Sequence, residues 1–72
     1  MTLYHAHGCH LCDRARSVLD RVGADYEAVD IIGDAELEAR YREWLPVVEI
    51  DGRRAFVYHV DEAALRRKLG RA

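Results

Sequence analysis

The sequence predicts a single α/β domain, residues 1–72, with the element order β-α-β-α-β-β-α. Three observations support this prediction. Short β-prone runs alternate with segments in which apolar residues recur at helical spacing. An Asp-Gly pair separates two adjacent runs near the C-terminal end, as in a β-hairpin. Half of the residues are hydrophobic, which allows a compact core in a chain of this length.

The first two elements are a strand and a helix. A short strand is expected over Thr2–Ala6, and His7 and Gly8 end it. A helix is expected from His10 onward, with Gly23 at the position where a glycine often ends a helix. The apolar residues of this helix recur at intervals of three and four: Leu11, Ala15, Val18, Leu19 and Val22.

A second strand and helix follow. The strand is expected over Tyr26–Ile31 and ends at Gly33, after which Asp34 can cap a helix. Pro46 cannot continue this helix, because the residue before a proline is pushed out of the α region. The helix has an aromatic and aliphatic stripe that we expect in the core rather than in a ligand-binding wall: Leu37, Tyr41 and Trp44.

The last elements are a hairpin and a helix. The strands of the hairpin are Val47–Ile50 and Arg53–Tyr58, and the Asp51–Gly52 pair between them favours a type I′ turn. Asp61 can cap the last helix. Two apolar residues are placed as a hydrophobic staple across its start, Val60 and Leu65.

Composition and charge exclude several classes of function. The formal net charge of −2 offers no basic field for nucleic acid. No apolar run approaches the ~20 residues of a membrane span, and the first residues lack the apolar core of a secretory signal. We therefore expect a cytoplasmic protein without nucleic-acid or membrane partners, and we expect a monomer.

Two cysteines, Cys9 and Cys12, carry the strongest functional signal. A bridge between them would close a tiny loop and stabilise the fold weakly, so a chemical role is favoured over a structural one. Both lie at a predicted strand-to-helix junction, where unpaired N–H groups and the helix dipole favour the thiolate of Cys9. Cys12 is nearly one helical turn away. This spacing suits attack on a disulfide by Cys9, followed by release of the product by Cys12.

The histidines leave alternatives open. His10 lies between the cysteines and either stabilises the Cys9 thiolate or simply faces solvent. His5 and His7 point to one side and, with the cysteines, could supply a mixed Cys/His metal site or an iron–sulfur module bridging two chains. The chain has no second C-x-x-C and no H-x₃-H to complete a standard zinc site. A third alternative is a redox-switched binding domain without turnover.

Five short motifs spread over the whole chain carry a resemblance to a known family: Leu3–Tyr4, Gly8–Asp13, Val29–Ile31, Leu45–Val47 and Asp51–Gly52. With them the chain resembles the glutaredoxin-like branch of the thioredoxin superfamily, in particular its small bacterial members with a C-x-x-C motif. The resemblance implies a minimal thioredoxin fold with a four-stranded mixed sheet, order 2-1-3-4, flanked by helices.

The resemblance also implies roles for individual residues. Cys9 would be the exposed nucleophile and Cys12 the resolving thiol, with a cis Pro46 packed beside them. Leu45 would offer its backbone to an extended substrate, in the manner of an added strand. Asp61 matches the acidic residue that glutaredoxins use for the amine of glutathione. The candidate substrate-binding residues are therefore His10, Leu45, Pro46 and Asp61.

Two departures from the family bear on glutathione. Ala6 stands where glutaredoxins commonly carry a lysine or arginine, which removes a contact for a glutathione carboxylate. Tyr58, His59 and Val60 replace the usual Gly-Gly and should crowd the glutathione groove. We expect a thiol–disulfide oxidoreductase without a bound cofactor that reduces protein or low-molecular-weight disulfides. Its reductant would be glutathione or thioredoxin reductase.

Overall fold

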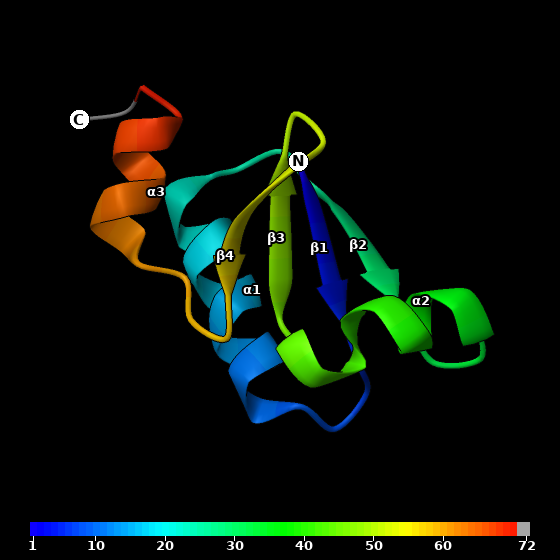
Figure 1. The fold of residues 1–72 in the computed structure, drawn as a ribbon. Coiled ribbons are helices and arrows are strands. Elements are labelled where there is room, and N and C mark those ends of the chain that lie inside the picture. Colours follow the sequence, from blue (N-terminus) through cyan, green and yellow to red (C-terminus); the bar gives the residue numbers. More distant parts are fainter. Residues whose placement is uncertain (71–72) are drawn as a thin grey trace.

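A computed structural model describes residues 1–70 and confirms the predicted element order (Figure 1). Four strands form one mixed sheet in the order β2-β1-β3-β4, as the family resemblance implied. The strand β1 pairs with β2 in parallel and with β3 antiparallel, and β3 pairs with β4 antiparallel. The strands are β1 (Thr2–His5), β2 (Glu27–Asp30), β3 (Val47–Ile50) and β4 (Arg53–Val57).

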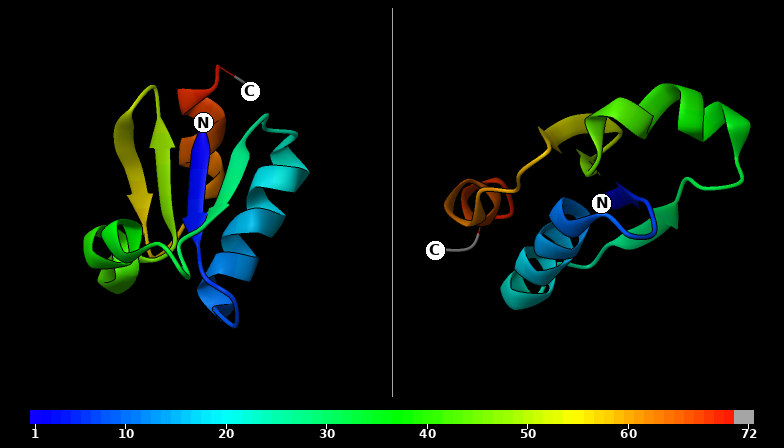
Figure 2. Two further views of the ribbon diagram at one scale, coloured as in Figure 1. Left: turned by 90° about the vertical axis from the view of Figure 1, so that its right-hand side faces the viewer. Right: turned by 90° about the horizontal axis from the view of Figure 1, so that it is seen from below.

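Three α-helices cover the two faces of the sheet. In Figure 2, α1 and α3 lie against one face, and α2 lies on the other. The helices are α1 (His10–Val22), α2 (Ala35–Tyr41) and α3 (Glu62–Lys68), and a short 3-10 helix η1 (Arg42–Trp44) follows α2 directly. None of the described helices has the length and apolar character needed to span a membrane.

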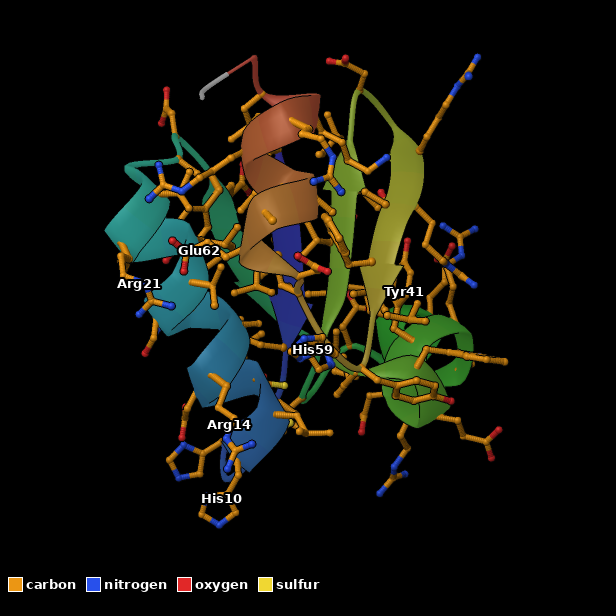
Figure 3. The ribbon with its side chains drawn as sticks, turned by 90° about the vertical axis from the view of Figure 1, so that its left-hand side faces the viewer. His10, Arg14, Arg21, Tyr41, His59 and Glu62 are labelled. Atoms are coloured by element: carbon orange, nitrogen blue, oxygen red, sulfur yellow. The ribbon has the colours of Figure 1, made fainter. Side chains whose placement is uncertain are left out.

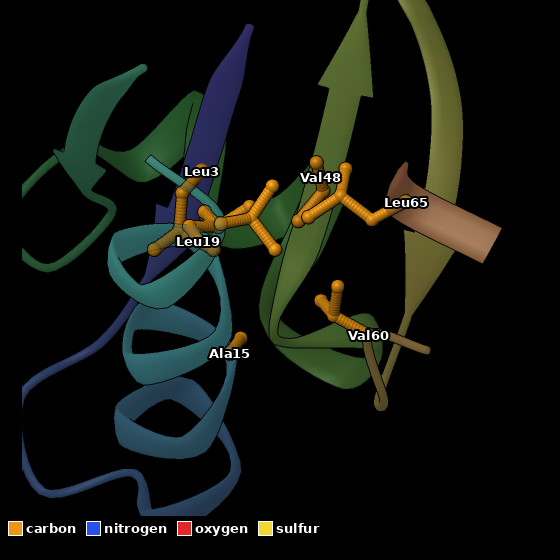
Figure 4. Packing of buried hydrophobic residues seen from close by; sticks show 7 residues of the cluster. Leu3, Ala15, Leu19, Val48, Val60 and Leu65 are labelled. Carbon is orange, nitrogen blue, oxygen red and sulfur yellow. The ribbon is translucent and has the colours of Figure 1, made fainter. Parts of the chain in front are cut away.

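The larger core fills the space between the sheet and the pair α1 and α3 (Figure 4). Leu3 of β1, Leu19 of α1 and Leu65 of α3 are completely buried there. Val60 and Leu65 belong to the same cluster, as expected for a hydrophobic staple across the start of α3. Because side chains alternate along a strand, the neighbours of Leu3 and Val48 face the other side of the sheet.

A smaller cluster lies on that other side, under α2. Tyr4 of β1 stacks on Tyr41 of α2, with ring centroids 4.2 Å apart. The hydroxyl of Tyr41 donates a hydrogen bond to Glu49 Oε2 over 2.8 Å. Trp44 was predicted in this core, but it is 42% exposed. The prediction was wrong because the α-helix ends at Tyr41 and the 3-10 helix that follows does not keep the helical spacing.

The local signals at turns and helix ends are confirmed. Asp51 and Gly52 have φ values of 53° and 75°, and a type I′ turn requires a positive φ at both positions. Asp34 Oδ1 accepts a hydrogen bond from the amide of Leu37, which caps α2. Gly23 closes α1 in the left-handed conformation. Strand ends differ from the predicted ones by a residue or two, as fraying ends do.

Candidate functional site

Cys9 caps the N-terminus of α1. Gly8, with φ 78°, turns the chain after β1, and Cys9 itself is extended, with φ −97° and ψ 111°. The Cys9 sulfur accepts a hydrogen bond from the amide of Cys12 over 3.2 Å. The backbone carbonyl of Cys9 accepts a hydrogen bond from the amide of Asp13, which is the first hydrogen bond of the helix. The residue is half-buried, so its sulfur is held at a helix end that solvent reaches.

Cys12 differs from Cys9 in its environment. It is 3% exposed, and both cysteines are free thiols. Burial, followed by the hydrogen bond with Cys9, raises the pKa of the Cys12 thiol from 9.0 to about 12. A backbone hydrogen bond from Ala6 lowers the pKa of Cys12, but its effect is smaller. Cys12 therefore stays protonated at neutral pH while its neighbour is accessible.

The histidines near the dithiol in the sequence do not cluster around the two sulfurs. His10 is exposed at the first turn of α1 (Figure 3). His7 is exposed, and His5 Nε2 lies 3.5 Å from Arg16 Nη2. Burial and the Arg16 charge lower the pKa of His5. Residues 1–70 bring together no group of three or more His, Cys, Asp or Glu side chains that could hold a metal ion.

The Leu45–Pro46 peptide bond is cis, as the resemblance implied. Pro46 is buried and Leu45 is half-buried. The register pairs Val47 with Tyr4, so the turn before β3 and the loop after β1 lie at the same end of the sheet. The carbonyl of Pro46 accepts the amide of Tyr58 over 3.0 Å, which joins this turn to the end of β4.

Asp61 has a structural task at the start of α3. Its Oδ1 accepts a hydrogen bond from the amide of Ala64 over 3.1 Å, and the residue is exposed. This confirms the predicted cap. One carboxylate oxygen is thus used within the helix, and a role for Asp61 toward an amine of glutathione stays a prediction.

The connection between β4 and α3 contains an unusual backbone conformation. Tyr58 has φ 65°, in the left-handed region that bulky side chains rarely adopt. Its hydroxyl donates to the carbonyl of Glu43 over 3.0 Å, and its ring lies 6.0 Å from that of Trp44. This residue stands where the family usually has Gly-Gly, and it is 45% exposed.

A groove of about 310 Å³ runs between α1 and this connection. Sequence reasoning missed it, and in particular missed Arg14. Leu11, assigned to the apolar face of the helix, is 43% exposed and lines the groove. The signal that was available is the spacing of Leu11, Arg14 and Val18, which places the three on one helix face. The lining residues are Leu11, Arg14, Ala15, Ser17, Val18, Arg21, Tyr58, His59 and Val60.

Comparison with known proteins gives consistent findings. The family model described as "Glutaredoxin-like domain (DUF836)" matches residues 1–70. No curated protein matches the chain. The X-ray structure of Northeast Structural Genomics target protein XcR50 from X. campestris is 36% identical with a TM-score of 0.83, covering 96% of this chain and 93% of that one. The solution structure of the same target is 34% identical with a TM-score of 0.79, covering 96% and 90%.

Proposed function

This chain belongs to the glutaredoxin-like domain family, and we propose that it is a thiol–disulfide oxidoreductase that works through Cys9 and Cys12. The proposal rests chiefly on the asymmetry of the two sulfurs. Cys9 is accessible at a helix N-terminus and accepts the Cys12 amide, whereas Cys12 is buried with its pKa raised to about 12. This difference supports Cys9 as the attacking thiol and Cys12 as the resolving thiol.

In the first step, the Cys9 thiolate attacks one sulfur of a substrate disulfide R–S–S–R′. A bond forms between Cys9 Sγ and the sulfur of R, the substrate S–S bond breaks, and R′–S⁻ leaves with the electron pair and takes a proton from water. The amide hydrogen of Cys12 and the N-terminus of α1 favour negative charge on Cys9 before the attack. The product is a mixed disulfide.

In the second step, Cys12 attacks Cys9 Sγ. The Cys9–Cys12 bond forms, the bond to R breaks, and the proton of Cys12 ends on the departing sulfur of R. Two electrons have then passed from the dithiol to the substrate. Because the Cys9 sulfur in a mixed disulfide carries no charge, one cause of the raised pKa of Cys12 is removed at the stage where Cys12 must ionise.

The oxidised protein needs two electrons to return to the dithiol. We propose that a thiol reductant supplies them, with glutathione or thioredoxin reductase as candidates. Two thiols would be oxidised to one disulfide for each cycle. Ala6 and Tyr58 weigh against tight glutathione binding, since one lacks a cation and the other adds a ring to the connection before α3.

We further propose that the substrate contacts the cis-proline turn. Leu45 and Pro46 lie at the same end of the sheet as the dithiol loop, where an extended segment could pair with the backbone of Leu45. His10 is placed at the rim of the first helical turn, and Asp61 at the start of α3 retains one carboxylate oxygen that no described hydrogen bond uses.

The test mixes pre-reduced protein with bis(2-hydroxyethyl) disulfide and counts the thiols released. The wild type should reduce one disulfide per chain and become oxidised by two electrons. Cys9→Ser should release none, and Cys12→Ser should stop at a mixed disulfide that mass spectrometry detects. Full activity of Cys9→Ser would exclude the proposal. Absence of thiol release by the wild type would favour a redox-switched binding domain.

A further inference from the structure

The groove between α1 and the β4–α3 connection points to the kind of disulfide that the protein reduces. We propose that this groove binds the polypeptide segment next to the substrate cysteine. Arg14 and His59 would hold a carboxylate of that segment, and Leu11 and Tyr58 would contact an apolar side chain. The inference rests on the proposed function, because it concerns which disulfides reach Cys9.

The groove begins at Leu11, beside the dithiol in the sequence, and is long enough for a peptide. Leu11 lies in the motif between Cys9 and Cys12, and Arg21 lines the other end. Arg21 follows Leu11 by ten positions along α1, which corresponds to a rise of about 15 Å. An extended polypeptide covers this length with about four residues. A segment bound through its cysteine at Cys9 can therefore continue directly into the groove.

The apolar part of the groove lies at the end nearest the dithiol. Leu11 and Tyr58 are large hydrophobic side chains that remain 43% and 45% exposed. Trp44, 42% exposed, lies against Tyr58 and extends the same surface toward the turn that contains Pro46. Exposed apolar side chains that meet in one place mark a binding surface more often than isolated ones do.

The conformation of Tyr58 supports a role for this residue beyond folding. A positive φ costs a non-glycine residue about 1–3 kcal/mol, and Tyr58 has φ 65°. Its amide donates to Pro46 O and its hydroxyl to Glu43 O, which hold the ring at the groove wall. Strained residues of this kind are concentrated at ligand sites.

The charges that line the groove are all basic. Its basic side chains are Arg14, Arg21 and His59, its only other titratable group is the phenol of Tyr58, and no carboxylate lines it. Arg21 is neutralised by Glu62, 2.8 Å away. Among residues 1–70, neither the side chain of Arg14 nor that of His59 has a hydrogen-bond or ion-pair partner. Figure 3 shows them on the same side of the molecule, one from α1 and one from the connection before α3.

This arrangement favours a carboxylate as the occupant. The chain as a whole carries a formal net charge of −2, so a basic groove beside the dithiol is a local feature and not the average of the surface. An anionic side chain bound there would gain ion-pair energy from Arg14 and a hydrogen bond from His59. A peptide that presents an apolar and an acidic residue near its cysteine matches both parts of the groove.

The experiment compares two peptides that each carry one cysteine as a mixed disulfide with 2-mercaptoethanol. In the first peptide, a Leu and an Asp stand on each side of the cysteine. The second peptide is identical except that Asn replaces each Asp. The second-order rate constant for thiol release by pre-reduced protein should be roughly fivefold higher for the Asp peptide. The difference should shrink at 0.5 M NaCl because salt screens exposed charges.

Variants identify the groove as the source of this preference. Arg14→Gln should lose most of the preference for Asp, and Arg14→Glu should reverse it. Arg67→Gln is the matched control, because Arg67 is an exposed cation of α3 that does not line the groove. Leu11→Ala should slow reduction of both peptides by a larger factor than it slows reduction of bis(2-hydroxyethyl) disulfide, which has no apolar side chain for Leu11 to contact.

The outcomes separate this inference from the proposed function. Equal rates for the two peptides, with normal reduction of bis(2-hydroxyethyl) disulfide, would overturn the inference and leave the oxidoreductase assignment intact. An Arg14 dependence seen with glutathione disulfide but not with the peptides would also overturn it, because the occupant would then be a small anionic disulfide. Failure to reduce any of these disulfides would remove the proposed function itself.

Discussion

The backbone amide of Cys12 donates its hydrogen bond to the sulfur of Cys9, and the two atoms lie 3.2 Å apart. This bond ties the accessible sulfur to the first turn of α1, where the helix N-terminus favours negative charge. The Cys12 side chain meanwhile points into the protein and is 3% exposed. The two thiols of one short motif should therefore differ sharply in reactivity.

The first prediction concerns alkylation of the reduced protein. Iodoacetamide at neutral pH should modify Cys9 and leave Cys12 unmodified, because Cys12 is buried and its pKa is raised to about 12. Mass spectrometry of the digested protein should find one label per chain. In guanidinium chloride both cysteines should react, since unfolding removes the burial.

Cys9→Ser provides the control for this labelling. The folded variant should take up no label, and the unfolded variant should take up one. If Cys12 were labelled in the folded protein as fast as Cys9, the two sulfurs would not have the different environments described above.

The second prediction concerns stability at alkaline pH. The pKa values of Cys12 and Tyr41 are raised to about 12 from 9.0 and 10.0, in both cases chiefly by burial. Between pH 9 and 12 the unfolded chain loses these protons while the folded chain keeps them. The free energy of unfolding therefore falls as pH rises through this range, and the contribution of both groups is fully present below pH 9.

Urea unfolding of the reduced protein at pH 8 and pH 11 tests this sign. The urea midpoint should be lower at pH 11, and the decrease should be smaller in Tyr41→Phe, which has no phenol to ionise. At pH 8 the same variant should be less stable by about 1 kcal/mol, because it lacks the hydrogen bond to Glu49. A midpoint that rises with pH would contradict the assigned shifts.

The fold was predictable from the sequence largely because its signals are local. Asp34 and Asp61 cap helices through hydrogen bonds to amides three residues ahead. Asp51 and Gly52 adopt the positive φ values that their residue types allow. Cys9 and Cys12 were assigned to the site from their position at a strand-to-helix junction, which needs no tertiary information.

The remaining features depend on contacts between distant segments. Arg14 is an ordinary charged helix residue in the sequence, and it lines a groove only because the β4–α3 connection passes beside α1. Tyr58 gives no sequence signal for a positive φ, since its conformation is held by bonds to Pro46 and Glu43. Trp44 lies outside the core because it belongs to a 3-10 helix and not to the preceding α-helix, and composition does not indicate this change of helix type.

The third prediction concerns Glu62, which connects α1 and α3. Its Oε1 accepts from Arg21 over 2.8 Å and its Oε2 from Arg66 over 3.1 Å. Hydrogen bonds from Arg21 and then Arg66 lower the pKa of Glu62 below 4.5. The stabilisation is present above pH 4.5 and is lost as pH falls through the lowered value.

Glu62→Gln should therefore be less stable than the wild type at pH 7, and the difference should narrow in acid as the wild-type carboxylate is protonated. Thermal unfolding of both proteins at pH 7 and at pH 3 measures the difference in stability under the two conditions. Glu27→Gln is the matched control, since Glu27 is exposed on β2 and forms no ion pair among residues 1–70. A difference of constant size at both pH values would mean that the charge of Glu62 has no part in it.

The fourth prediction concerns the backbone at Tyr58. Tyr58→Gly and Tyr58→Ala both lose the ring beside Trp44 and the hydrogen bond to Glu43. They differ in that alanine keeps a Cβ in the left-handed region, where glycine has no steric cost. Tyr58→Gly should therefore be more stable than Tyr58→Ala by about 1 kcal/mol in urea unfolding.

The neighbouring Val57 shows whether this order is specific to position 58. Val57 belongs to strand β4, where alanine is expected to be the more stable of the two substitutions by about 0.5–1 kcal/mol. An opposite order of Gly and Ala at these adjacent positions would establish the left-handed conformation of Tyr58 in solution. Because both variants at position 58 remove the ring that lines the groove, they should slow reduction of the two cysteine peptides to the same extent, although they differ in stability. A large difference in the rate of peptide reduction between Tyr58→Gly and Tyr58→Ala would mean that the backbone conformation, and not the ring, controls access to the groove.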